Sequence, residues 1–242
     1  MDLKNLPLLD ARLALAASFV REGGIVADVG TDHAYLPIWL IFSGVCPRAV
    51  ASDINEGPLQ SARDHAEKYG VADRMDFVLA DGLAAIDLDA IGVTDIAICG
   101  MGGEMIAGIL DAAPYTRRAG VRCILQPMSS VEDLRTYLAR TGYVIEDERL
   151  AEAAGRIYTC LAVSYDGQSR TLTPAQTLLG AAHIDRGAAE ALFAPYLLRE
   201  YRSVQKKYRG RLAGGLDTSA EKELLTELQQ IAAENGICLP KE

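Results

Sequence analysis

Residues 25–37 read IVADVGTDHAYLP, and this stretch sets the fold class that we predict for the chain. An apolar run interrupted by Asp28 ends at Gly30, and a second apolar segment with Ile38 and Trp39 follows a polar turn. That order predicts a strand, a tight turn and a helix. Such a turn brings the backbone close to a ligand and directs the N–H groups of the helix start at it, as in many α/β proteins that hold nucleotide-like molecules.

The turn differs from a dinucleotide-binding loop. Gly30 supplies conformational freedom at the bend. Asp32 and Ala34, however, stand where the pattern G-x-G-x-x-G would place a second glycine and a small neighbour. Because a carboxylate beside the loop repels a pyrophosphate, the turn suits a ligand that lacks one.

The composition is that of a globular protein: 242 residues, 50% hydrophobic and 24% charged. Lys plus Arg number 24 against 33 Asp plus Glu, and the net charge of -9 argues against a protein that coats nucleic acid, although a local basic patch is compatible with it. No uncharged run has membrane-spanning length, and the charged N-terminus, with Asp2 and Lys4, is not typical of a signal peptide. We predict a cytoplasmic protein with no membrane partner.

Five cysteines occur at wide spacing and form no C-x-x-C pair. They are Cys46, Cys99, Cys123, Cys160 and Cys238. An odd number of scattered cysteines favours reduced, mostly buried thiols in an intracellular protein, and no metal site is predicted.

Two further strands end in acidic residues. The strand predicted over Arg48–Asn55 places Asp53 where an α/β nucleotide site has the carboxylate that binds ribose hydroxyls. Pro58, near the next helix start, equally fits Asp53 as a helix cap. The strand over Met75–Ala80 leads to Asp81-Gly82, which is either a base-binding turn or a plain Asp-Gly turn.

A fourth strand, Thr94–Cys99, runs into Gly100-Met101-Gly102-Gly103. Three glycines in four positions are costly in folding entropy, so close approach by a ligand is the simpler explanation. We expect Gly102 and Gly103 in particular to leave room for a substrate.

The remaining sequence completes the sheet. A leading helix is predicted over Leu8–Val20, with Arg12 off its apolar stripe. A fifth strand, Val121–Gln126, should stop at Pro127. Tyr143–Arg149 and Arg156–Tyr165 read as two strands with no helix between them, which requires an antiparallel hairpin. This pattern matches the seven-stranded, Rossmann-like sheet of class I S-adenosylmethionine-dependent methyltransferases.

After a polar linker at 166–173, the apolar residues recur at helical spacing throughout, so we predict domains over residues 1–165 and 174–242. Helices are expected over Pro174–Ala182, over Ala188 to about Arg211, and over Ser219–Asn235, the last two forming a helical hairpin. Gly210, Gly214 and Gly215 fit the turn. The basic residues that crowd the first long helix are either a solvated face or an RNA contact.

Taken together, the motifs resemble the bacterial tRNA (adenine-22, N1)-methyltransferase family. The strings at 27–37 and 100–103 carry the resemblance, and Leu125-Gln126-Pro127 and Gly155-Arg156-Ile157-Tyr158 support it. It spans roughly residues 6 to 165 by motif, while the helical tail agrees only in character with the family's C-terminal domain. Met128 departs from the pattern, because members often carry Asn there.

The resemblance implies methyl transfer from S-adenosyl-L-methionine to N1 of adenosine 22 in the tRNA D-arm, with S-adenosyl-L-homocysteine as product. It implies a cofactor site formed by Asp28, Gly30, Thr31, Asp32, His33, Asp53, Ile54, Asp81, Gly82 and Gly100. It implies catalytic roles for Asp32, Gly100, Met101, Gly102 and Gly103. It implies tRNA contacts by Arg12, His33, Tyr35, Arg202, Lys206, Lys207, Arg209 and Arg211.

The chemistry suits these residues. Adenine N1 already has a lone pair, so the reaction needs alignment more than a strong base. Asp32, or a carbonyl of the 100–103 segment, would stabilise the positive charge that develops on the base. Because N1 lies on the pairing edge, the base must leave its stack, and Tyr35 or His33 would stack or hydrogen-bond with it.

Two other classes of function stay open at this point. A nicotinamide-dependent oxidoreductase would use the same first three strand-helix units, but the terminal hairpin and the broken glycine pattern speak against it. A module that binds cofactor or RNA without turnover is the second alternative, because a fold alone proves no activity.

Overall fold

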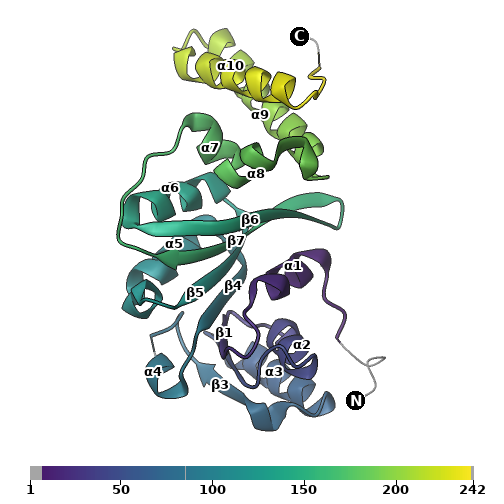
Figure 1. Ribbon diagram of the computed structural model, residues 1–242, viewed down its shortest axis with the longest axis vertical. Coiled ribbons are helices and arrows are strands. Elements are labelled where there is room, and N and C mark those ends of the chain that lie inside the picture. The colour runs from purple at the N-terminus through teal and green to yellow at the C-terminus, as the bar shows by residue number, and fades with distance from the viewer. Residues whose placement is uncertain (1–6, 85, 241–242) are drawn as a thin grey trace. The chain divides into compact units, whose positions relative to one another are not determined.

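The computed structural model describes residues 7–84 and 86–240, so Asp2 and Lys4 of the signal-peptide argument lie outside the described residues. The chain forms two compact units, the first ending at Arg170 and the second beginning at Thr171 (Figure 1). The domain limits expected from the sequence remain a prediction.

Within the described residues, the first unit is built on a seven-stranded sheet in the order β3-β2-β1-β4-β5-β7-β6 (Figure 1). The strands are β1 (Val26–Val29), β2 (Ala49–Asp53), β3 (Met75–Leu79), β4 (Asp95–Gly102), β5 (Arg122–Ser129), β6 (Tyr143–Ala153) and β7 (Arg156–Tyr165). Strands β1 to β5 pair in parallel, and β7 pairs antiparallel with both β5 and β6. The predicted sheet with its terminal antiparallel hairpin is confirmed.

Helices cover both faces of this sheet (Figure 1). They are α1 (Ala11–Phe19), α2 (Tyr35–Phe42), α3 (Glu56–Lys68), α4 (Leu88–Ile91), α5 (Gly103–Ala112) and α6 (Val131–Thr141), with short 3-10 turns at η2 (Ala72–Arg74) and η3 (Pro114–Arg117). Apolar side chains of α1, α2 and α3 form one core cluster, and those of α4, α5 and α6 form the other. The sheet is therefore buried on both faces, as parallel sheets require.

Side chains alternate between the two faces of the sheet along each strand, and this alternation decides to which face each polar side chain points. Ala97 and Ile124 belong to the core under α1 to α3, whereas Ile96 and Ile98 belong to the opposite core. Asp28 is in register with Ala97, and Gln126 lies two residues beyond Ile124. Asp28 and Gln126 therefore face α1 and α2 near the carboxyl ends of the strands.

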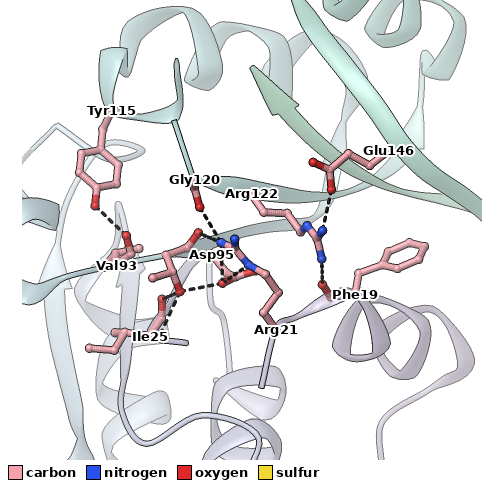
Figure 2. A network of polar contacts seen from close by, with 10 residues as sticks. Phe19, Arg21, Ile25, Val93, Asp95, Tyr115, Gly120, Arg122 and Glu146 are labelled. Carbon is pink, nitrogen blue, oxygen red and sulfur yellow. Dashed lines mark hydrogen bonds and ion pairs between the residues drawn. The ribbon is translucent and has the colours of Figure 1, made fainter. Parts of the chain in front are cut away.

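A polar network at the opposite, amino end of the sheet holds α1 in place. Figure 2 shows the Arg21 guanidinium donating to the buried Asp95 carboxylate and to the carbonyl oxygen of Gly120. Arg122 donates to the carbonyl oxygen of Phe19, the last residue of α1 (Figure 2). These bonds fix the end of α1 to the starts of β4 and β5.

Strand β5 is longer than the sequence predicts. Pro127 does not stop it, because the ladder with β4 shifts register around Cys99 and Met101, so that Pro127 sits at an irregularity in the pairing. A bulge tolerates the missing N–H of a proline. The 100–103 segment is correspondingly not a free loop, because Gly102 still pairs with Ser129.

The second unit is helical. Its elements are α7 (Pro174–Leu179), α8 (Ala181–Arg186), η4 (Gly187–Ala189), α9 (Phe193–Ala213) and α10 (Ser219–Glu234). Gly180, at φ +87°, divides the helix predicted over Pro174–Ala182, and Gly187 delays the start of the first long helix to Phe193. Gly210 lies inside α9 rather than in the turn, which Gly214 and Gly215 form.

Candidate active site

A cavity of about 220 Å³ opens at the carboxyl ends of β1 and β4. Its lining is Arg12, Leu13, Asp28, Gly30, Thr31, Asp32, His33, Tyr35, Leu36, Cys99 and Gly100. The structure thus brings together six of the ten predicted cofactor residues with Arg12 and Tyr35. The site comes from α1, the β1–α2 turn and the end of β4.

Asp28 is the buried acid of this cavity. The Thr31 hydroxyl donates to its Oδ2 at 2.6 Å. Burial raises the pKa of Asp28 from 3.8 to about 6, the Thr31 hydrogen bond opposes this rise, and the negative charge of Asp53 adds to it. A positive ligand in the cavity would favour the ionised carboxylate, so Asp28 fits a cation rather than a phosphate.

The β1–α2 turn is compact. The N–H groups of Gly30 and Thr31 donate to the carbonyl oxygen of Ser52 at 2.8 and 2.9 Å, and that of Ala34 donates to Thr31. These three N–H groups are therefore not free for a ligand, and the expected use of the N–H groups at the start of α2, which begins at Tyr35, stays a prediction. The turn offers no phosphate cradle there.

Gly30 has two structural reasons to be glycine. Its φ of +70° is costly for other residues, and a Cβ atom would lie 2.1 Å from Met101 Cε. Asp32 and Ala34 also have positive φ, at 49° and 55°, although neither is glycine. Strained residues that gather at a cavity are typical of functional sites.

Aromatic rings form one rim of the cavity. His33, Tyr35 and His65 lie with ring centroids 5.2 to 5.5 Å apart. His33 Nδ1 is 2.7 Å from Ser61 Oγ, and His65 Nδ1 donates to the His33 carbonyl oxygen at 3.2 Å. Ser61 and His65 were not among the predicted site residues, and their spacing of four residues on α3 is the signal in the sequence that could have indicated them.

Arg12 reaches the cavity from α1 and does not project freely into solvent. Its Nη1 donates to Gln126 Oε1 at 2.8 Å and to Met128 Sδ at 3.2 Å, and its Nη2 pairs with Asp10 at 2.7 Å. Although Arg12 lies off the apolar stripe of its helix, its side chain is therefore not simply solvated. Gln126 was missed as a site residue, although its motif was noted.

The other predicted cofactor residues lie beyond the cavity lining. Asp53 ends β2, and its Oδ1 accepts the N–H of Asn55 at 2.9 Å. The N-cap of α3 is Asn55, so the interpretation of Asp53 as the helix cap is wrong. Ile54 is exposed. Asp81 and Gly82 line a second cavity of about 400 Å³ beside α5. Their cofactor contacts remain predictions.

The glycines of the 100–103 segment differ from one another. Gly100, at φ +80°, borders the cavity with nothing within 4 Å of a built Cβ atom. At Gly103 that atom would lie 2.2 Å from the Ser130 carbonyl oxygen, so this glycine serves helix packing. A Cβ atom built at Gly102 would lie 3.4 Å from Ser129 Oγ, and the Met101 side chain fills the space beside Gly30. Open space is thus found at Gly100, whereas close packing explains Gly103, where room for a substrate was expected.

The basic residues of α9 fall into two sets. Lys207 and Arg211 pair with the buried Glu221 of α10 at 3.3 and 3.4 Å. Arg202, Lys206 and Arg209 are exposed and follow the i, i+4, i+7 spacing of one helix face. We name these three residues the basic stripe.

Within residues 7–84 and 86–240, no three or more His, Cys, Asp or Glu side chains gather as a metal-binding group. In the same part of the chain, no helix combines the length and the apolarity needed to cross a membrane.

Comparisons with known proteins identify the family of this chain. A family model described as a methyltransferase domain matches residues 9–161. The chain is 32% identical over 230 residues to the tRNA (adenine(22)-N(1))-methyltransferase of Bacillus subtilis, covering 91% of this chain and 92% of that protein.

Solved structures are similar over the same extent. The crystal structure of the tRNA methyltransferase TrmK of B. subtilis has a TM-score of 0.77 at 29% identity, covering 94% of this chain and 98% of that one. A Streptococcus pneumoniae protein in complex with S-adenosyl-L-methionine has a TM-score of 0.77 at 35% identity, covering 90% and 100%. The chain therefore belongs to the bacterial tRNA (adenine-22, N1)-methyltransferase family of class I methyltransferases.

Proposed function

We propose that this protein transfers the methyl group of S-adenosyl-L-methionine to N1 of adenosine 22 in the D-arm of tRNA. The observation that carries the proposal is the 32% identity over 230 residues to a tRNA (adenine(22)-N(1))-methyltransferase, an extent that exceeds the first unit and so includes part of the helical tail. Because its substrate is tRNA, the enzyme acts in the cytoplasm.

The cavity suits this cofactor. S-adenosyl-L-methionine carries positive charge and no phosphate, and the cavity offers the acidic Asp28 and a turn in which the N–H groups of Gly30, Thr31 and Ala34 are already used. Asp53, at the end of β2 beside the strand that carries Asp28, would accept hydrogen bonds from the ribose hydroxyls. Asp81 and Gly82, after β3, would hold the adenine edge.

When bound, the cofactor supplies an electrophilic methyl group on a sulfonium. The adenine N1 lone pair needs no general base, so the task of the protein is to align the base with that methyl group. Gly100, with no side chain at the cavity wall, leaves space for the base edge. The exposed carboxylate of Asp32, which lies 3.6 Å from His33 Nε2, would stabilise the positive charge that passes to the adenine ring.

The aromatic rim serves the extruded base. His33 and Tyr35 present adjacent rings at the cavity, and the Ser61 contact fixes the imidazole of His33. A base that has left its stack recovers part of the lost energy by stacking on such rings. These residues therefore select a flipped purine.

The basic stripe is the tRNA contact of the tail. Arg202, Lys206 and Arg209 present positive charge on one exposed face of α9, in a chain whose overall charge repels phosphate. Lys207 and Arg211, also predicted as tRNA contacts, have a competing role because both pair with Glu221.

Ligand titration tests the proposal against its alternatives. Calorimetry with S-adenosyl-L-methionine should show saturable binding at one site per chain, and NADH should not bind. Binding of NADH alone would favour the oxidoreductase alternative. Cofactor binding without methyl transfer to any tRNA would favour a non-catalytic module.

A further inference from the structure

Three chain segments far apart in sequence meet at the Gln126 side chain. This side chain is fully buried at the end of β5. Its Oε1 accepts from Arg12 Nη1 of α1 at 2.8 Å and from the Gly100 N–H at the end of β4 at 3.2 Å. Its Nε2 donates to the Pro127 carbonyl oxygen at 2.9 Å, which fixes the orientation of the amide.

Arg12 is held from several sides. Its Nε and Nη2 donate to Asp10 Oδ2 at 3.0 and 2.7 Å, and its guanidinium lies 5.4 Å from the centre of the Tyr158 ring. Asp10 caps α1 by accepting the N–H of Leu13. Because the Asp10 carboxylate neutralises this guanidinium locally, Arg12 is poorly suited to binding a phosphate.

The far end of α1 is fixed as well. Arg21 and Arg122 tie it to the amino ends of β4 and β5 (Figure 2). Arg12 therefore stands on a helix anchored at both ends, with its guanidinium aimed at Gln126. Rigid support of this kind is what holds a reacting group to within a fraction of an ångström.

We infer that Arg12 and Gln126 form a clamp that fixes the Gly100 backbone at the cavity wall and so positions the methyl-accepting base. The inference rests on the proposed function for its substrate. In the clamp, Gln126 holds the Gly100 N–H, and Arg12 prevents the Gln126 amide from rotating away. Both are positioning residues, and neither makes a phosphate contact.

The clamp and a phosphate contact predict opposite kinetics for Arg12→Ala. A misplaced base loses on the order of 10²-fold in kcat. The affinity for tRNA and the slope of that affinity against salt should stay unchanged. A lost phosphate contact would instead weaken tRNA binding, lower the salt slope by about one unit and leave kcat at saturating tRNA intact.

Two further variants separate positioning from loss of fold. Gln126→Leu should reproduce the kcat defect, and Gln126→Glu, which keeps the acceptor oxygen, should retain more activity. Since both residues act in one unit, the double variant Arg12→Ala/Gln126→Leu should be no slower than the slower single variant. The thermal midpoint serves as the folding control. Multiplicative losses in the double variant would overturn the clamp.

Amide hydrogen exchange tests the clamp without turnover. The Gly100 N–H should exchange about two- to tenfold faster in Gln126→Leu and in Arg12→Ala than in the wild-type chain. Unchanged exchange in both variants would overturn the clamp. A wild-type chain that methylates no tRNA would overturn the proposed function instead, so the two failures are distinguishable.

Discussion

At the scale of single residues, Asp28 joins two properties that rarely coincide. It is buried at the end of a central strand, and it has a second carboxylate, Asp53, close enough to raise its pKa. Burying an acid without a full ion pair is unfavourable for folding. A cationic ligand that supplies the missing positive charge explains why such an acid is placed at the cavity.

Cofactor affinity should therefore depend on pH through Asp28. Its pKa is raised to about 6, so the carboxyl is mainly neutral at pH 5 and ionised at pH 7.5. Binding a cation below pH 6 must first remove that proton, which weakens affinity by up to about tenfold per pH unit. Calorimetry with S-adenosyl-L-methionine from pH 5 to 7.5 measures this.

Asp28→Asn is the matched control, because it keeps the shape and removes the titration. We expect it to bind more weakly at pH 7.5 and to lose the slope between pH 5 and 6. Equal wild-type affinity at pH 5 and pH 7.5 would show that Asp28 does not face the cofactor's charge.

Gly30 provides a second residue-level prediction. Gly30→Ala should weaken cofactor binding, because a φ of +70° is strained for a residue with a side chain and because the Met101 methyl group must move away from the new Cβ atom at the cavity wall. Gly102→Ala is the control, since its Cβ would lie 3.4 Å from Ser129 Oγ and its φ is −68°. Cofactor titration of both variants, after checking that each is folded, measures the difference. Wild-type affinity in Gly30→Ala would contradict the assignment.

The sequence predicts those residues of the cavity that lie together in one short motif. Asp28 and Gly30 lie in one continuous stretch, so their proximity needs no knowledge of the fold. Gln126 and His65 were missed because their roles depend on which distant element packs against them. Only the strand register and the placement of α1 bring Arg12 to Gln126, and no local pattern contains that information.

At the scale of elements, the basic residues of α9 have two different roles. Its basic stripe faces solvent, while Lys207 and Arg211 hold α10 through Glu221. The sequence shows one basic cluster, and only the helical geometry divides it. An experiment that reverses Lys207 would therefore disturb the hairpin as well as any RNA contact.

Reversing single charges on the two helices tests the basic stripe cleanly. Lys206→Glu should weaken tRNA binding and lower the slope of log affinity against log salt by about one unit. Lys222→Glu is the matched control, because Lys222 is also an exposed helical lysine but lies beside Glu221 and Glu223 on α10. Filter binding at several salt concentrations measures both.

Equal salt slopes for Lys206→Glu, Lys222→Glu and the wild-type chain would contradict a role of the basic stripe in binding tRNA. The affinity for S-adenosyl-L-methionine should be the same in all three proteins, which controls for folding of the first unit.

The ends of some helices and strands are not predicted by the local preferences of proline and glycine. Pro127 was expected to end β5, yet the register shift against β4 accommodates it, and the strand continues to Ser129. Conversely, Gly210 was assigned to the turn after the first long helix, and it lies inside α9. Both outcomes depend on pairing and packing partners, which override local preference.

At the scale of the whole molecule, the order of elements was the strongest signal. Alternating strands and helices followed by two strands without a helix left an antiparallel hairpin as the natural end of the sheet, and the structure has that hairpin. The reaction is less visible in the fold, because many chemistries share this sheet. Motifs and whole-chain similarity carry that part of the account.

The most direct test is methyl transfer to defined tRNA transcripts. The purified protein, with S-adenosyl-L-methionine and a transcript that has adenosine 22, should yield 1-methyladenosine mapped to position 22 by mass spectrometry of nuclease fragments. The same transcript with guanosine 22 should yield none. Methylation at another position, methylation of the guanosine-22 transcript, or no methylated nucleoside with a cofactor-binding protein would contradict the account.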